Sequence, residues 1–172
     1  IFKTDKEKEL LMYRSHTDEL TGCFNRHAYE EDIVQLRMDE AFVYISLDMN
    51  GLKTVNDSLG HAAGDELIRG VASCMKQCFA EVGKVYRIGG DEFVIIVLDQ
   101  MQNIENIRET FDKTVRRWQG KMVKEMSVSC GYVSSDEKEW DTNYDIAKAA
   151  DARMYENKAA YYQKSGRDRR KR

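Results

Sequence analysis

The segment KVYRIGGDEFVIIVL, residues 84–98, carries the strongest structural signal in the chain. Two runs rich in β-branched and aromatic residues, 84–88 and 92–98, flank the pair Gly89-Gly90. Such runs are typical of strands, and a Gly-Gly connection favours a tight hairpin with a primed turn, which requires positive φ angles. The segment therefore predicts an antiparallel pair of strands at the centre of a sheet.

Helical and strand patterns alternate on both sides of this hairpin. We expect a buried strand at 41–47 and a strand with one buried face at 125–133. Helices are predicted at 25–37 (with Asn25 as N-cap), 51–58, 62–80, around the apolar positions 104–118, and at 143–163. This order, with antiparallel pairing at its centre, predicts an α/β sandwich with helices on one or both faces of the sheet.

The chain has the length and composition of one domain. Its 172 residues include 42% apolar residues and no proline, and no linker-like stretch divides them. The longest apolar runs, 41–47 and 93–98, are far shorter than the ~17–25 residues of a membrane helix. We interpret 1–16 as the end of a connecting helix from a missing upstream region, and 17–172 as the domain itself.

Charge and cysteine content exclude several classes of protein. The tail 164–172 is basic, and the rest of the chain is acidic enough to make it a poor nucleic-acid binder. The four cysteines form no CxxC pair, so reduced thiols are favoured over a zinc site. These features predict a cytoplasmic domain, whether or not the full-length protein is anchored in a membrane.

Acidic residues stand where the predicted strands meet turns. Asp48 follows the strand 41–47, and Asp91 and Glu92 follow the Gly-Gly pair. If these strands are neighbours, the carboxylates converge at one edge of the sheet. Hard oxygen ligands favour Mg²⁺ or Mn²⁺, and such ions commonly hold nucleotide phosphates. The alternative is a solvated turn with ordinary surface acids.

The segment 48–65 opens like a calcium-binding loop but does not continue as one, because leucines stand at its fifth and twelfth positions. Lys53 lies close behind Asp48 and is suited to hold a phosphate beside a metal. Asn56 and Asp65 offer an amide and a carboxylate for the donor edge of guanine. Each of these residues, taken alone, fits a turn or a helix cap better than a binding role.

Together these segments resemble a known family. The motifs are DELTGCFNR (18–26), LDMNGLKTVNDSLGHAAGDE (47–66), RIGGDEF (87–93), MSVSCGYV (126–133) and AADARMYENK (149–158). In this order and spacing they identify the chain, over about 17–169, as a member of the GGDEF family of diguanylate cyclases.

The resemblance implies a fold and an activity. The fold is a mostly antiparallel sheet of about five strands wrapped by helices, like the palm of nucleotidyl cyclases, with a ferredoxin-like core. Family members join two GTP molecules into cyclic di-GMP and release pyrophosphate, using Mg²⁺ or Mn²⁺, expected here as two ions per site. Each domain binds one GTP, so a homodimer is expected, with an upstream sensory or regulatory domain controlling it.

The resemblance also implies roles for individual residues. The expected metal ligands are Asp48, the Met49 carbonyl, Asp91 and Glu92. The expected catalytic residues are Glu92, as a ligand or as the group that helps deprotonate the 3′-hydroxyl, and Lys53. The expected substrate-binding residues are Asn56, His61 and Asp65 at guanine, Lys53 and Lys158 at the triphosphate, and Gly89 and Gly90, where the chain passes close to the nucleotide.

The chain departs from the family pattern at several positions. Asn50 and Leu52 replace an Asp and a Phe, and Asn157 replaces an Ala. Tyr161 and Tyr162 stand where Gly-Arg is usual; Gly166-Arg167 follow five residues later, so either Arg167 reaches the phosphates or that contact is absent. Ala80 and Gly83 occupy the ends of the RxxD motif, which predicts that the product-inhibition site is absent.

Three functional hypotheses follow from these observations. The first is an active diguanylate cyclase, supported by the intact signature. The second is a catalytically weak or inactive GTP-binding module that regulates or dimerises, motivated by Tyr161 and Tyr162. The third is another nucleotide cyclase chemistry on the same fold, which the identity of the product distinguishes.

Overall fold

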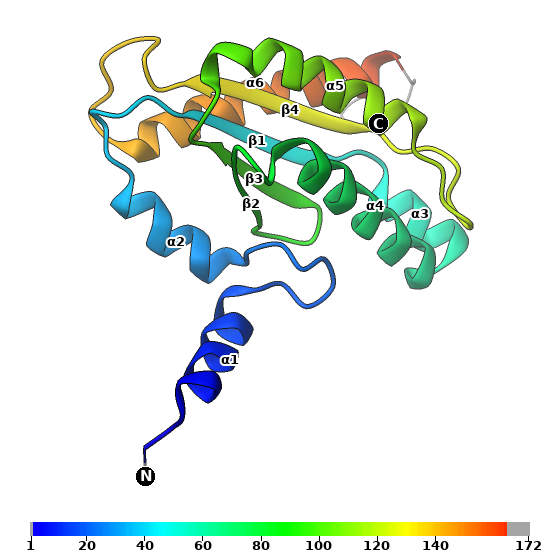
Figure 1. The fold of residues 1–172 in the computed structure, drawn as a ribbon. Helices are drawn as coiled ribbons and strands as arrows, with labels where there is room; N and C mark the ends of the chain where they lie inside the picture. The colour runs from blue at the N-terminus through cyan, green and yellow to red at the C-terminus, as the bar shows by residue number, and fades with distance from the viewer. Residues whose placement is uncertain (1, 165–172) are drawn as a thin grey trace.

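A computed structural model describes residues 2–164 and contains one four-stranded sheet (Figure 1). The strands are β1 (Val43–Met49), β2 (Gly83–Arg87), β3 (Glu92–Val97) and β4 (Val128–Ser134). Their order is β2-β3-β1-β4, and every neighbouring pair is antiparallel. The described part of the chain thus supplies the four strands predicted from the residue pattern, one fewer than the five or so implied by the resemblance.

The described residues also form six α-helices and a short 3-10 turn. They are α1 (Asp5–His16), α2 (Arg26–Gln35), α3 (Leu52–Leu59), α4 (His61–Phe79), the turn η1 (Met101–Asn103), α5 (Ile104–Arg117) and α6 (Asn143–Lys164). The Asn25 side chain accepts a hydrogen bond from the Ala28 amide and caps α2, as predicted.

Each face of the sheet supports its own hydrophobic core. Side chains of α4 and α5 pack with one face, which includes Ile45 and Leu47 of β1. Side chains of α2 and α6 pack with the other face, which includes Tyr44. Because both faces are covered, all of β1 is buried, and apolar residues follow one another at its start instead of alternating with polar ones. The predicted α/β sandwich is confirmed.

The β2–β3 hairpin forms as predicted, but its turn is not a primed one. Neither Gly89 nor Gly90 has a positive φ angle, and the connection spans residues 88–91. The amides of Ile88 and Gly89 both donate to the Glu92 carbonyl, and the Arg87 guanidinium donates to the Gly90 carbonyl at 2.9 Å. The prediction was wrong because a side chain closes a wider turn.

The segment before α2 is fastened to this hairpin. Asp18 accepts hydrogen bonds from the amide and hydroxyl of Thr21 and pairs with Arg87 at 3.3 Å. Helix α1 lies beyond this segment, extends away from the sheet (Figure 1) and contains no buried residue. Its position therefore depends on the junction between α1 and α2 rather than on the core.

Candidate active site

The register of β1 and β3 brings the predicted acidic residues to one edge of the sheet. Asp48, near the end of β1, lies opposite Glu92, the first residue of β3. The Met49 amide donates to the Asp91 carbonyl at 2.9 Å, which joins the strand end to the turn. The sheet itself thus assembles the acidic edge, defined here as Asp48, Met49, Asp91 and Glu92.

Asp48 is the buried member of the acidic edge. One oxygen, Oδ2, accepts a hydrogen bond from Nζ of Lys158 in α6 at 2.7 Å, and the side chain is only 9% exposed. The other oxygen, Oδ1, is buried without a hydrogen-bond partner in the described protein. Burial raises the pKa of Asp48 to about 6; the charges of Asp91 and Glu92 also raise it, whereas Lys158 lowers it.

This donor set fits a hard divalent cation. Nζ of Lys158 lies 2.7 Å from Asp48 Oδ2 and 3.4 Å from the Met49 carbonyl oxygen, so two predicted ligands already face one positive charge. The unpartnered Oδ1 atom is a further acceptor at the same place. Carboxylate and carbonyl oxygens are the ligands that Mg²⁺ prefers. Asp91 and Glu92 add two less buried carboxylates.

Asn50, which replaces an aspartate of the family pattern, points away from the acidic edge toward β4. Its amide nitrogen donates to the Ser127 hydroxyl at 2.9 Å, and the Ser129 hydroxyl donates to its carbonyl oxygen at 3.0 Å. The substitution therefore leaves the Asp48 carboxylate and Met49 carbonyl in place and secures the end of β1 to β4.

The residues expected around guanine lie on α3 and α4, which pack together. Asn56 and Asp65 are half-buried, whereas Lys53 and His61 are exposed. Gly64 was not predicted as a functional residue, although it belongs to the 47–66 motif. A Cβ atom at Gly64 would overlap Oδ1 of Asn56. Gly64 thus makes room for the observed orientation of the Asn56 amide.

An aromatic ring occupies the neighbourhood of Lys158 where the family pattern places Gly-Arg. Nζ of Lys158 lies 5.9 Å from the centre of the Tyr162 ring, which meets the Tyr161 ring edge-on. Asn157, the milder departure, accepts a hydrogen bond from the Cys130 amide at 3.0 Å and so ties α6 to β4. Gly166-Arg167 lies outside the described residues.

Ala80 and Gly83, which stand where the RxxD motif has its Arg and its Asp, have structural roles in this chain. Ala80 is the C-cap of α4, and Gly83 is the first residue of β2. A Cβ atom at Gly83 would overlap the Ile96 carbonyl oxygen of β3. The close approach of the two backbones therefore leaves no room for an aspartate side chain at this position.

Comparison with known proteins places the chain in a family. Residues 15–164 match the family model described as "Diguanylate cyclase, GGDEF domain". A probable diguanylate cyclase of Escherichia coli K12, DgcJ, is 34% identical over 148 residues, which are 83% of this chain and 29% of that protein. The diguanylate cyclase VdcA of Vibrio cholerae is 32% identical over 149 residues, 82% of this chain and 43% of that protein. The chain belongs to the GGDEF diguanylate cyclase family.

Solved structures share the fold. The diguanylate cyclase SiaD of Pseudomonas aeruginosa, in complex with its activator SiaC, has a TM-score of 0.77 at 25% identity over 90% of this chain and 62% of that one. The coiled coil and GGDEF domain of Caulobacter crescentus DgcB has a TM-score of 0.78 at 24% identity, over 90% and 86%. This chain spans less than half the length of the two curated relatives.

Within residues 2–164, no helix combines the length and the apolar character needed to cross a bilayer.

Proposed function

We propose that this domain is a diguanylate cyclase, a nucleotidyltransferase that condenses two GTP molecules into cyclic di-GMP and releases pyrophosphate. The arrangement of Asp48 and Met49 carries the proposal. Their oxygen atoms already attract one cation, the Lys158 ammonium, which shows that the place favours positive charge. Two Mg²⁺ or Mn²⁺ ions bound at the acidic edge would supply charge stabilisation to the attacking and leaving oxygens.

The chain's own residues position the substrate and move one proton. Asn56, His61 and Asp65 orient the guanine, and Lys53 and Lys158 neutralise the triphosphate. Glu92 helps to take the proton from the 3′-hydroxyl of one GTP. That 3′-oxygen then bonds to the α-phosphorus of the other GTP as pyrophosphate leaves. The reciprocal attack in the facing domain forms the second bond and releases the second pyrophosphate. Positioning and charge screening provide most of the rate enhancement.

The reaction requires two copies of the domain, since each holds one GTP. We propose a homodimer in which two acidic edges face each other, with residues 1–16 connecting the domain to an upstream sensory or regulatory region. The curated relatives are longer than this chain, which is consistent with such a region. The proposed place of action is the cytoplasm.

A GTP-binding regulatory module is the second candidate. The Tyr162 ring near Lys158 favours it, because this position usually carries an arginine in the family pattern. An aromatic ring supplies no charge to a phosphate, so substrate affinity is the property most affected.

Product analysis distinguishes these functions. The protein is incubated with GTP and Mg²⁺ or Mn²⁺ at a concentration where light scattering shows a dimer, and products are separated with mass detection. We expect cyclic di-GMP and pyrophosphate. Bound but unchanged GTP would favour the regulatory module, and a different cyclic product would favour another cyclase chemistry.

A matched pair of variants tests the assigned proton acceptor. Glu92→Gln removes the carboxylate charge at the acidic edge and is expected to abolish turnover. Glu109→Gln makes the same change on the exposed surface of α5 and is expected to retain it. Retained turnover in Glu92→Gln would refute the role of Glu92.

A further inference from the structure

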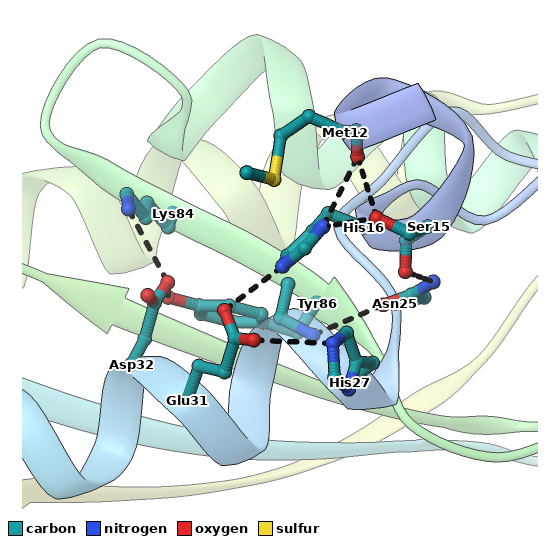
Figure 2. A network of polar contacts seen from close by, with 10 residues as sticks. Met12, Ser15, His16, Asn25, His27, Glu31, Asp32, Lys84 and Tyr86 are labelled. Carbon is teal, nitrogen blue, oxygen red and sulfur yellow. Dashed lines mark hydrogen bonds and ion pairs between the residues drawn. The ribbon is translucent and has the colours of Figure 1, made fainter. Parts of the chain in front are cut away.

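Three side chains of types that can ligate metals gather where α1 meets α2 (Figure 2). His16 is the last residue of α1, and His27 and Glu31 lie one turn apart on α2. Nε2 of His16 is 2.8 Å from one carboxylate oxygen of Glu31, and Nε2 of His27 is 3.1 Å from the other. We call these residues the junction cluster; none belongs to the candidate active site.

The surroundings of His16 leave its Nε2 atom facing an acceptor. Its Nδ1 atom lies 3.0 Å from the Met12 carbonyl and 2.6 Å from the Ser15 hydroxyl, which itself donates to Met12 (Figure 2). A carbonyl only accepts, so the Met12 contact favours the tautomer with its proton on Nδ1. Nε2 then points at the Glu31 carboxylate, which also only accepts. A positive centre, either a proton or a metal ion, must lie between them.

The same arrangement is typical of metal-bound histidines, in which one ring nitrogen donates to a backbone carbonyl and the other faces the ion. The donor atoms of the junction cluster all lie within 4.8 Å of one another. Ligands of a tetrahedral zinc ion are separated by about 3.4 Å, given metal–ligand bonds of about 2.0–2.1 Å. A small adjustment of exposed side chains therefore converts the junction cluster into a coordination shell.

The donor types and exposure select the class of ion. Two imidazole nitrogens and one carboxylate suit zinc and similar transition metals, whereas Mg²⁺ prefers oxygen alone. The His16 side chain is 19% exposed, whereas His27 and Glu31 are about half exposed, at 57% and 48%. The cluster thus combines one enclosed ligand with an open side for the ion and a water molecule.

We propose that the junction cluster binds a divalent transition-metal ion of the zinc type and thereby fastens α1 to α2. Helix α1 has no buried residue, and its end is held by hydrogen bonds from Asn25 to the carbonyls of Ser15 and His16, both at 2.9 Å. A shared ion would add a strong link between the helices and restrict the direction in which α1 leaves the domain. The proposal does not depend on the proposed function.

Zinc titration with matched variants tests this proposal. Zn²⁺ is added to metal-free protein in competition with a chromophoric chelator, and affinities are compared among variants. We expect His27→Ala and Glu31→Gln each to weaken the tightest site about 100-fold or more, since second-shell losses alone cost 10–100-fold. Glu30→Gln, the adjacent carboxylate on α2, and His61→Ala, the remaining histidine, are expected to leave it unchanged.

Two further readouts locate the ion. Co²⁺ in place of Zn²⁺ should give visible absorption that Glu31→Gln removes, and Zn²⁺ should slow amide hydrogen exchange at residues 12–17 in the unmodified protein. Because His16→Ala also loosens α1, the two exposed α2 variants decide the result. Zinc affinity that is unchanged in both, or that falls equally in Glu30→Gln, would overturn the proposal.

Discussion

Asp48 and Glu31 both lie beside nitrogen-bearing side chains, but in opposite environments. Asp48 is 9% exposed, lies in a strand and is paired with the ammonium of Lys158, which is far away in the sequence but adjacent in the fold. Glu31 is 48% exposed on α2 and lies between two imidazoles. Loss of a partner leaves a buried charge without compensation in the first case, whereas water replaces the partner in the second. Burial, rather than the number of contacts, therefore determines how much each pair matters to the fold.

The largest loss of stability is expected when the buried Asp48 carboxylate loses its partner, Lys158. At a pH well above the raised pKa of Asp48, Lys158→Met should destabilise the metal-free protein by roughly 3–5 kcal/mol, because the buried Asp48 carboxylate is then charged and without its partner. Adding Asp48→Asn to this variant should restore much of the loss, since the charge is then removed. Urea unfolding measures both effects, and Lys148→Met, an exposed lysine of α6, is the control. Equal stability of Lys158→Met and the control would contradict this account of Asp48.

A carboxylate introduced without space or partner should also destabilise the protein. Gly83→Asp places a side chain against the Ile96 carbonyl and should cost roughly 1–3 kcal/mol, by urea unfolding, as overpacking usually does. For the proposed cyclase activity, the same crowding predicts that the unmodified protein keeps its initial rate as cyclic di-GMP is added. Inhibition at low micromolar product would show that the chain binds product despite Ala80 and Gly83.

A methyl group added at Gly64, which carries no charge, should weaken ligand binding more than it weakens the fold. Gly64→Ala displaces the Asn56 amide and should weaken binding of a non-hydrolysable GTP analogue roughly 10–100-fold, the loss of one or two hydrogen bonds. Calorimetric titration measures the affinity, and circular dichroism confirms the fold. Ala62→Gly, an exposed change at the start of α4, serves as the control. Unaltered affinity would remove Asn56 from the guanine site.

The smallest change in stability is expected at the exposed carboxylate of Glu31. In metal-free protein, Glu31→Gln should shift the urea midpoint very little, because exposed ion pairs contribute little to stability. With Zn²⁺ present, the unmodified protein alone should gain thermal stability, since the ion binds only the folded cluster. A large loss of stability in metal-free Glu31→Gln would mean that the imidazole contacts matter to the fold as much as the Lys158 contact does.

Local patterns predicted most of the fold. Apolar periodicity located the strands and helices of the sandwich, and Asn25 caps α2 as its residue type and position suggested. The Gly89-Gly90 turn was mispredicted because its geometry depends on the Arg87 side chain, which local propensity does not include. Gly64 was missed because its role is visible only when α3 and α4 are packed together.

The acidic edge was predicted in part. The positions of Asp48, Asp91 and Glu92 at strand ends suggested that they converge, and the β1–β3 register brings Asp48 opposite Glu92. The direction of the Asn50 side chain was left open by the sequence, and the hydroxyls of Ser127 and Ser129 decide it. The pairing of Lys158 with Asp48 joins residues 110 positions apart, so no local pattern indicates its distance.

The sequence by itself determined the family, the order of the helices and strands, and the acidic residues at the ends of the strands, because these follow from motifs and short-range periodicity. Only the tertiary structure decided which carboxylate is buried, which cation faces it, and that His16 of α1 meets His27 and Glu31 of α2. Burial and long-range pairing arise when separate elements pack, and they set the electrostatic environment in which each charged side chain acts.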